Sequence, residues 1–246
     1  MDTDTLVQLG FDAAEAVTAA LAKLGDWGPS TTRPGQYRLD LAADEAALGV
    51  LHGAGLGSLS EESGRHHPDR PLVAVVDPVD GSTNAHRGLP WYATSVCVLD
   101  GDGPLAAVVV NLATGSRFWA ARGSGAFGDD GPLTPSGATE LAESIVALSG
   151  LPEVSLGCSQ TRAFGACALD LCAVAGGHVD AFFDATRPAA HGPWDYLGGL
   201  LICWEAGVPI ADADGGDLVV VSHAARRSPV AAATPELLCQ LRSLIS

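Results

Sequence analysis

The segment that most constrains the fold is Asp77-Pro78-Val79-Asp80-Gly81-Ser82-Thr83-Asn84, which directly follows the apolar run Leu72 to Val76. This run is short and rich in β-branched residues, so it predicts a buried strand. Pro78 favours extended backbone at Asp77, and we therefore expect the strand to end at Asp77. Pro78 and the following glycine then turn the chain, which allows the carboxylates of Asp77 and Asp80 to converge.

This turn has the chemistry to bind a cation next to an anion. Two carboxylates three positions apart offer oxygen ligands, which hard divalent cations prefer. The backbone amides of Gly81, Ser82 and Thr83 open a short helix and can attract an anion. Taken alone, the segment is equally consistent with an ordinary surface turn rich in Asp, Pro and Gly.

Hydrophobic periodicity predicts alternating helices and strands along the rest of the chain. Helices are expected over the first two dozen residues, with Gly25 as a stop, and over Leu39 to Leu51, Phe164 to Ala175, Trp194 to Ala206 and Pro235 to Leu244. Further strands are expected at Tyr92 to Leu99, Leu105 to Asn111, Arg117 to Ala121, Ile145 to Ser149, Val179 to Phe183, Val208 to Ala211 and Leu218 to Val221.

This order of elements predicts an α/β layered sandwich in two halves. Residues 1–137 would hold an antiparallel sheet, and residues 138–246 would hold a parallel or mixed sheet with helices packed on it. The Gly/Pro/Asp-rich stretch that ends at Gly137 is the expected boundary between the halves. We expect the two halves to form one compact unit.

Composition limits the classes of partner. With 47% hydrophobic and 17% charged residues, the 246-residue chain can bury a large core. A net charge of −16 argues against nucleic acid or an anionic membrane as the main partner and favours cations. Met1-Asp2-Thr3-Asp4 has neither the basic nor the apolar region of a secretory signal, and no stretch predicts a transmembrane helix, so we expect a cytoplasmic protein.

Two more acidic segments flank the central one. Ser60-Glu61-Glu62-Ser63-Gly64 precedes it, and His191-Gly192-Pro193-Trp194-Asp195 places an acid in the first turn of an apolar helix. Alone, Asp195 would be interpreted as a helix cap and the glutamates as solvated loop charges. In this order, and with Glu205-Ala206-Gly207 behind them, the three segments resemble the inositol monophosphatase family from about Arg33 to the carboxyl end.

The resemblance implies a magnesium-dependent phosphomonoesterase with an αβαβα sandwich fold, usually a homodimer. By similarity, Glu61, Asp77 and the carbonyl of Val79 would bind one Mg²⁺. Asp77, Asp80 and Asp195 would bind a second Mg²⁺. A third, weakly held ion is left open. Oxygen-only ligands agree with what magnesium chemistry requires.

The resemblance also implies roles in hydrolysis by metal-activated water. Ser82 stands in place of the family's usual threonine, and with Asp44 it would orient or deprotonate the attacking water beside the metal held by Glu61. Gly81, Ser82 and Thr83 would face the phosphate. Without the resemblance, Asp44 would be interpreted as an exposed helix residue. Asp195 would lie on the leaving-group side.

Two departures from the family pattern bear on these roles. The chain reads Arg38-Leu39-Asp40-Leu41 where relatives have Asp-x-x-Thr, which leaves the third metal and lithium inhibition open. Arg33 is a candidate for the basic residue expected upstream. Between Ser149 and Arg162 the chain lacks a helix that relatives usually have, which leaves the pocket and the dimer contact less defined.

The substrate pocket is expected to differ from that of inositol-specific members. Pro188 stands where those members carry an acid, and Gly165-Ala166-Cys167 replaces a more polar segment. We expect Asp80 and these three residues to contact the substrate, and Arg187 or His191 to meet an anionic or hydrogen-bonding group on a substrate other than myo-inositol phosphate. Purely structural roles for Arg187 and His191 are equally consistent. The substrate would be a small phosphorylated polyol, sugar or related metabolite. Alternatives are a bisphosphate phosphatase acting on fructose 1,6-bisphosphate or a 3′-phosphonucleotide, a histidinol phosphatase, and a regulatory family member without turnover.

Overall fold

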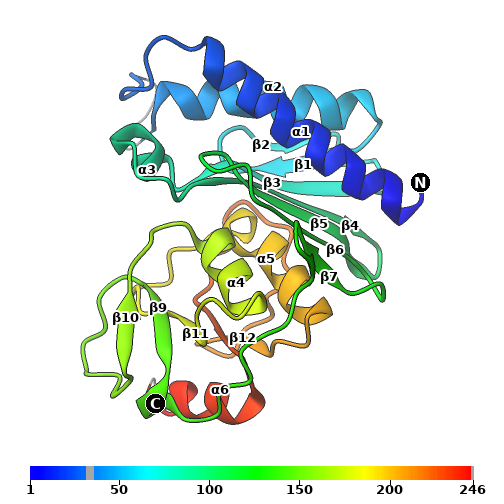
Figure 1. The fold of residues 1–246 in the computed structure, drawn as a ribbon. Coiled ribbons are helices and arrows are strands. Elements are labelled where there is room, and N and C mark those ends of the chain that lie inside the picture. Colours follow the sequence, from blue (N-terminus) through cyan, green and yellow to red (C-terminus); the bar gives the residue numbers. More distant parts are fainter. Residues whose placement is uncertain (32–35, 245–246) are drawn as a thin grey trace.

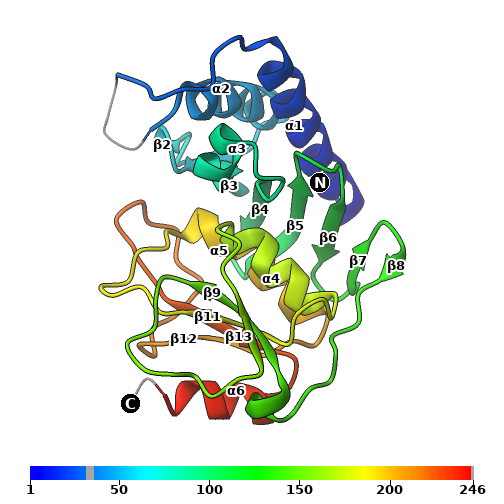
Figure 2. The same ribbon diagram turned by 60° about the vertical axis from the view of Figure 1, so that its left-hand side comes forward.

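The computed structural model describes residues 1–31 and 36–244 and has five layers. Two helices cover the outer face of an eight-stranded sheet, two more lie between this sheet and a five-stranded sheet, and one covers the far side of the second sheet (Figures 1 and 2). In that order the helices are α1 (Thr3–Lys23), α2 (Arg38–Gly53), α4 (Cys167–Ala175), α5 (Pro193–Glu205) and α6 (Pro235–Arg242). The predicted αβαβα sandwich is confirmed. Arg33 lies outside the described residues.

The first sheet has the strand order β2-β1-β3-β4-β5-β6-β7-β8. Its strands are β1 (Gly57–Ser60), β2 (Gly64–His66), β3 (Val73–Asp80), β4 (Ala93–Asp100), β5 (Gly103–Asn111), β6 (Arg117–Ala121), β7 (Ala126–Gly128) and β8 (Gly131–Pro132). Neighbours are antiparallel as expected, except that β1 runs parallel to β3. The parallel pair was not predicted because β1 is short and polar and pairs only through tertiary contact.

The second sheet has the order β10-β9-β11-β13-β12 and mixes parallel and antiparallel pairs, as predicted. Its strands are β9 (Ile145–Ser149), β10 (Gln160–Arg162), β11 (Ala181–Asp184), β12 (Ile210–Asp212) and β13 (Pro229–Ala232). A short 3₁₀ turn, Leu141–Glu143, precedes β9. The strand expected at Leu218 to Val221 is wrong. These residues form an irregular segment whose apolar side chains pack on the core, and β13 follows instead.

The apolar pattern of α5 follows from its position. Most of its residues are buried on every side, because the helix lies between the two sheets and packs against α4. By contrast, α1 buries one stripe at helical spacing and leaves its other face to solvent. Within the described ranges, no helix has the length and apolar character needed to cross a membrane.

Candidate metal centre

A β-bulge places Asp77 and Asp80 on the same side of the first sheet. In a regular strand, residues three apart point to opposite faces. Here Asp77 pairs with Ser95 and Asp80 with Ala93, so β3 has one more residue than β4 between the two pairs. The expected end of the strand at Asp77 is therefore wrong. The strand passes through Pro78, whose carbonyl accepts a hydrogen bond from Thr94 Oγ1 at 2.8 Å.

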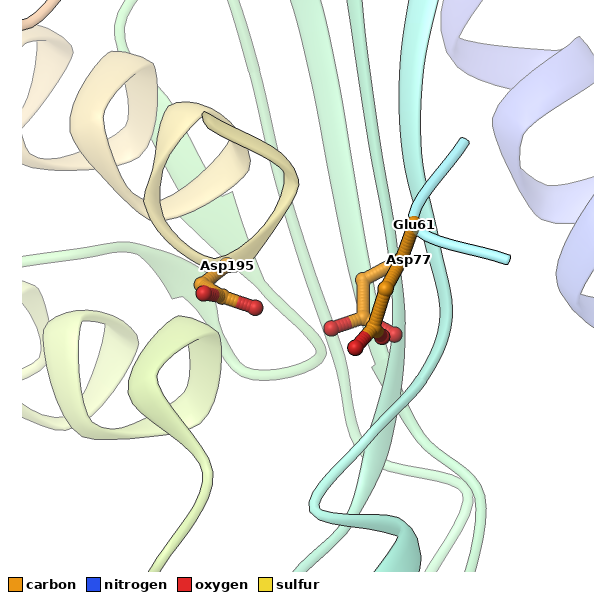
Figure 3. A group of neighbouring side chains, drawn as sticks. All are labelled: Glu61, Asp77 and Asp195. Atoms are coloured by element: carbon orange, nitrogen blue, oxygen red, sulfur yellow. The ribbon is translucent and has the colours of Figure 1, made fainter. Parts of the chain in front are cut away.

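Three acidic side chains from separate elements converge on one point. Glu61 follows β1, Asp77 lies in β3, and Asp195 lies in the first turn of α5. One carboxylate oxygen from each lies within 4.8 Å of those of the other two. Figure 3 shows the Asp195 carboxylate directed across the gap toward Glu61 and Asp77. The structure thus brings together acids that are 134 positions apart at most (195 − 61).

Asp80 adjoins this cluster and is anchored to α4. Its Oδ2 accepts a hydrogen bond from the Ala168 backbone N–H at 2.7 Å, and its side chain is buried. Like Asp195, Asp80 is therefore fixed by the first turn of a helix, where a negative charge is favoured. Val79, the expected carbonyl ligand, lies between the two aspartates, and its N–H donates to Asp77 Oδ1 at 3.0 Å.

Burial, together with repulsion between neighbouring acids, raises the pKa values of Glu61, Asp77 and Asp80. Burial and the charges of Asp195 and Glu62 raise the pKa of Glu61 to about 9. Burial and Glu61 hold the pKa of Asp77 well above its usual range. Burial and Asp195 raise the pKa of Asp80 to about 7. Without a cation, the folded protein therefore has to keep protons on acids that are charged in water.

The donor set fits a hard divalent cation. All the side-chain ligands are carboxylates, which suits Mg²⁺ better than zinc or iron. The oxygens of Glu61, Asp77 and Asp195 lie within 4.8 Å of one another, near enough to converge on a magnesium ion, whose ligands lie at roughly 2.0–2.1 Å. A divalent cation here would relieve the repulsion that raises the acids' pKa values.

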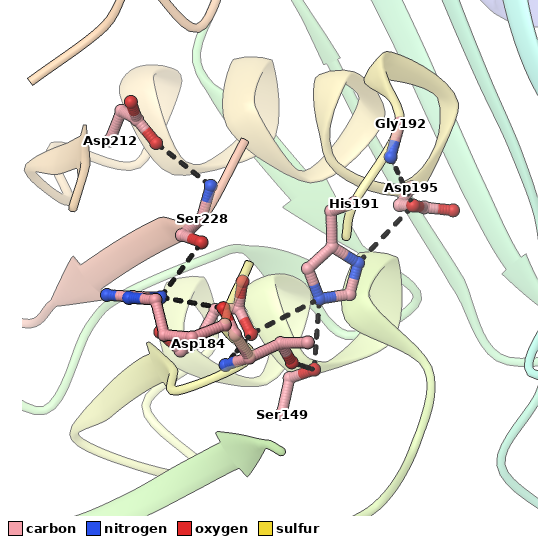
Figure 4. Close-up of polar contacts among 9 residues, drawn as sticks. Ser149, Asp184, His191, Gly192, Asp195, Asp212 and Ser228 are labelled. Atoms are coloured by element: carbon pink, nitrogen blue, oxygen red, sulfur yellow. Dashed lines mark hydrogen bonds and ion pairs between the residues drawn. The ribbon is translucent and has the colours of Figure 1, made fainter. Parts of the chain in front are cut away.

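His191, a candidate substrate contact just before α5, lies in a hydrogen-bonded network (Figure 4). His191 Nδ1 is 3.3 Å from Asp195 Oδ2, and its Nε2 is 3.0 Å from Ser149 Oγ. Burial acts to lower the pKa of His191, but the hydrogen bond to Asp195 and the charge of Asp184 outweigh it and raise this pKa to about 9. Asp195 Oδ2 also accepts the Gly192 N–H at 2.7 Å, so Asp195 caps its helix as well.

Arg187 faces a different part of the second sheet. Its Nη1 donates to the carbonyls of Asp184 and Thr186 and to Ser228 Oγ, at 3.3, 2.8 and 3.0 Å. It also lines a surface cavity of about 160 Å³ together with Leu156, Phe183 and Leu244. The structure therefore gives Arg187 contacts within its own loop and sheet rather than with the acidic cluster.

Asp44 supports the backbone next to Glu61. Ser60 Oγ donates to Asp44 Oδ1, and the Glu62 N–H donates to the same Ser60 Oγ at 3.3 Å. Among the described residues no hydrogen bond joins Asp44 to Ser82, the expected catalytic pair. Ser82 is half-buried at the start of α3 (Ser82–Arg87).

The turn of Gly81, Ser82 and Thr83 is held by close packing. Gly81 has φ +86°, and a Cβ on it would meet the carbonyl oxygens of Trp91 and Gly165 at 3.0 and 3.1 Å, and the Ala166 Cβ at 3.1 Å. Only glycine fits here, on both backbone and steric grounds. The structure thus places Gly165 and Ala166, two expected substrate contacts, against the turn.

Two neighbours of this turn complete its surroundings. Cys167 follows Ala166 as the buried first residue of α4. Thr83 is exposed, and its Oγ1 is 3.3 Å from the Tyr37 hydroxyl.

Asn84 connects these parts and was not assigned a role from the sequence. Its Nδ2 donates to the carbonyls of Trp91 and Phe164, at 2.8 and 2.7 Å. This fixes the loop that leads into α4, where Asp80 is anchored. The sequence feature that could have indicated this role is the position of Asn84 at the end of the segment Asp77 to Asn84.

Comparison with known proteins decides the family. Residues 52–246 match the family model described as "Inositol monophosphatase family". The chain belongs to the inositol monophosphatase family. It is 30% identical over 233 residues to an inositol-1-monophosphatase of Mesorhizobium japonicum, covering 87% of this chain and 86% of that protein.

Two other family members show the range of named functions. A fructose-1,6-bisphosphatase/inositol-1-monophosphatase of Methanothermobacter thermautotrophicus is 33% identical over 223 residues, 81% of this chain and 79% of the relative. The crystal structure of the extragenic suppressor protein suhB from Bartonella henselae superimposes with a TM-score of 0.82 at 27% identity, covering 98% of each chain. Family membership supports a metal-dependent phosphatase and leaves the substrate open.

Proposed function

We propose that this inositol monophosphatase family protein hydrolyses a phosphate monoester of a small metabolite with the help of two Mg²⁺ ions. The observation that carries the proposal is the convergence of Glu61, Asp77 and Asp195 within 4.8 Å, with Asp80 beside them. Glu61, Asp77 and the Val79 carbonyl would hold one ion, and Asp77, Asp80 and Asp195 the other. When bound, the ions would neutralise the phosphoryl oxygens and activate water for attack.

The protein's own groups would bind and orient the reactants. The amides of Gly81, Ser82 and Thr83 would donate to the phosphate, which the fixed conformation of Gly81 supports. Ser82 would position the attacking water. We assign Asp44 to this step only indirectly, because it holds Ser60 and thereby the backbone at Glu61.

The leaving group would depart on the side of α5. Asp195 is held there by Gly192 and His191, so His191 is better suited to orienting this carboxylate than to contacting the substrate directly. Gly165, Ala166 and Cys167 lie at the same junction of turn and helix and remain proposed pocket residues, as does Asp80. The contacts of Arg187 favour a structural role.

The substrate class remains a small phosphorylated polyol, sugar or related metabolite. A bisphosphate is a specific alternative, because one relative is named a fructose-1,6-bisphosphatase/inositol-1-monophosphatase. A regulatory role without turnover is less well supported, because all four metal carboxylates are present. A cytoplasmic location is part of the proposal, and so is a homodimer, which rests on the family resemblance.

Phosphate release from a panel of phosphate monoesters, with and without Mg²⁺, tests the proposal. Asp80→Asn keeps an oxygen that can accept the Ala168 N–H but removes the charge, so we expect kcat/KM to fall at least on the order of 100-fold. Asp214→Asn, an exposed loop acid, is the matched control and should retain activity. Release that needs no Mg²⁺, or no release from any ester, would contradict the proposal.

A further inference from the structure

The segment that joins β12 to β13 lies over the acidic cluster. It is the orange segment that approaches the first sheet in Figures 1 and 2. His223 Nε2 lies 3.1 Å from the Glu61 carbonyl oxygen, and the His223 ring lies 4.8 Å from the ring of Trp194. Since Trp194 directly precedes Asp195, this segment touches both sides of the proposed metal centre.

Backbone-directed contacts hold this segment in place. The Arg227 N–H donates to the His191 carbonyl at 2.9 Å, and Arg227 Nε donates to the Asp217 carbonyl at 2.8 Å. From β2, Arg65 Nη1 reaches the Val221 carbonyl at 3.4 Å. The segment is thus attached to the residues just before α5 and to the first sheet.

Unlike Arg227, Arg226 is exposed and stacks on an aromatic ring. Its guanidinium lies 5.2 Å over the ring of Trp194, which is only 4% exposed and so forms a fixed platform. Its Nη1 donates to the carbonyls of His223 and Ala225 at 2.9 and 2.7 Å, and the residue is exposed. Within residues 1–31 and 36–244, no carboxylate forms an ion pair with Arg226, although the chain has 29 acidic and 13 basic residues.

We propose that Arg226 binds a second anionic group of the substrate, a phosphate or carboxylate other than the phosphate that is hydrolysed. The inference rests on the proposed function and narrows its substrate class to phosphate monoesters that carry another negative group. A guanidinium stacked on an aromatic ring is prearranged for two-point contact with such a group. In the described part of the chain, Arg226 forms no ion pair with an acid of the proposed metal centre and instead lies over Trp194, so we assign it to the second anionic group rather than to the hydrolysed phosphate.

Matched substrate pairs test this inference. Fructose 1,6-bisphosphate is compared with fructose 1-phosphate, and 2-phosphoglycerate with glycerol 2-phosphate, so that each pair differs in the second anion. We expect Arg226→Gln to lower kcat/KM for the doubly anionic members on the order of 10- to 100-fold, mainly through KM, and for their partners by less than about threefold. The pair that responds shows whether the second group is a phosphate or a carboxylate.

Two further variants separate charge from geometry. Arg226→Lys keeps the charge but loses the planar two-point contact, so we expect an intermediate loss. Arg162→Gln removes the same charge from an exposed residue of β10 and should affect neither member of a pair. Equal losses for both members, or no loss in Arg226→Gln, would overturn the inference.

A binding experiment distinguishes failure of this inference from failure of the proposed function. Calorimetry in Mg²⁺ would compare alkane bisphosphonates of increasing chain length with an alkyl monophosphonate, none of which is hydrolysed. If wild type cleaves no ester but binds bisphosphonates more tightly, and Arg226→Gln loses only this preference, the anion site stands and the hydrolase proposal fails. Equal affinity of wild type and Arg226→Gln for the bisphosphonates would overturn the anion site.

Discussion

At the scale of single residues, the acids of the metal centre differ in what holds them. Asp80 and Asp195 are each tied to a backbone N–H in the first turn of a helix, at Ala168 and Gly192. Glu61 is held through its backbone, whose N–H donates to the Val76 carbonyl at 3.2 Å. The sequence predicted all of these acids as ligands, because their neighbours in the chain carry the family resemblance.

Binding of Mg²⁺ is expected to release protons. The pKa of Glu61 is raised to about 9 and that of Asp80 to about 7, so Glu61 is protonated at neutral pH in the metal-free protein. A cation must displace these protons, and its affinity should therefore rise with pH, by up to about tenfold per unit for each proton released. Calorimetry in buffers of different ionisation enthalpy measures the protons directly. An affinity that does not change between about pH 6 and pH 9 would contradict this expectation.

At the scale of elements, the bulge in β3 and the position of α5 create the centre. The bulge turns Asp80 toward α4, and the close approach of α5 to the first sheet and to α4 brings Asp195 within reach. Two adjacent glycines permit this approach. A Cβ on Gly198 would lie 2.5 Å from Ser95 Oγ, and a Cβ on Gly199 would lie 2.6 Å from the Leu171 Cβ.

Gly199→Ala is expected to destabilise the protein although alanine favours helices. The lower entropy of the unfolded chain should raise the free energy of unfolding by about 1 kcal/mol. The overlap of the new Cβ with Leu171 forces α4 and α5 apart, however, and should lower the free energy of unfolding by about 1–3 kcal/mol or more. Gly49→Ala in α2 is the control, because nothing lies within 4 Å of its added Cβ; it should be neutral or stabilising. Urea unfolding of both variants measures the difference. Equal stability of the two variants would show that α5 has room to shift.

At the scale of the whole molecule, the metal centre joins two layers. Glu61 and Asp77 belong to the first sheet, whereas Asp195 belongs to the helix layer between the sheets. A bound ion would therefore add a link between layers that are otherwise joined by apolar packing and by hydrogen bonds such as that of Asp80 with Ala168. The metal-free protein keeps four acids at this junction, and the raised pKa values of Glu61, Asp77 and Asp80 make its stability depend on pH.

The metal-free protein is expected to lose stability as pH rises from about 5 to about 9. Glu61, Asp77 and Asp80 hold protons in the folded state that the unfolded chain releases, so folding is penalised above the unfolded pKa values. His191, whose folded pKa is raised to about 9, acts in the same direction, because its contribution is lost as pH rises through that value. Thermal unfolding across this range measures the trend, and a Tm that rises with pH would contradict it.

Mg²⁺ is expected to reverse this loss. At about 100 times its dissociation constant it should stabilise the fold by about 2.7 kcal/mol, or roughly 5–10 °C in Tm. At a fixed Mg²⁺ concentration the stabilisation should grow with pH, because the affinity grows with pH. Asp195→Asn should lose this response, because it removes the ligand that joins the helix layer to the sheet. Asp214→Asn should keep it.

The sequence by itself determined the layered α/β class and most helices and strands, and it singled out the acids that the structure brings together. It could do so because hydrophobic period and turn residues act locally, and because the acidic segments carry the family resemblance in their order. Only the tertiary structure decided the parallel pairing of β1 with β3, the bulge that turns Asp80, the Ser60 contact of Asp44 and the position of Arg226 over Trp194. Each depends on which distant segments meet in space, and no local pattern of residues fixes that.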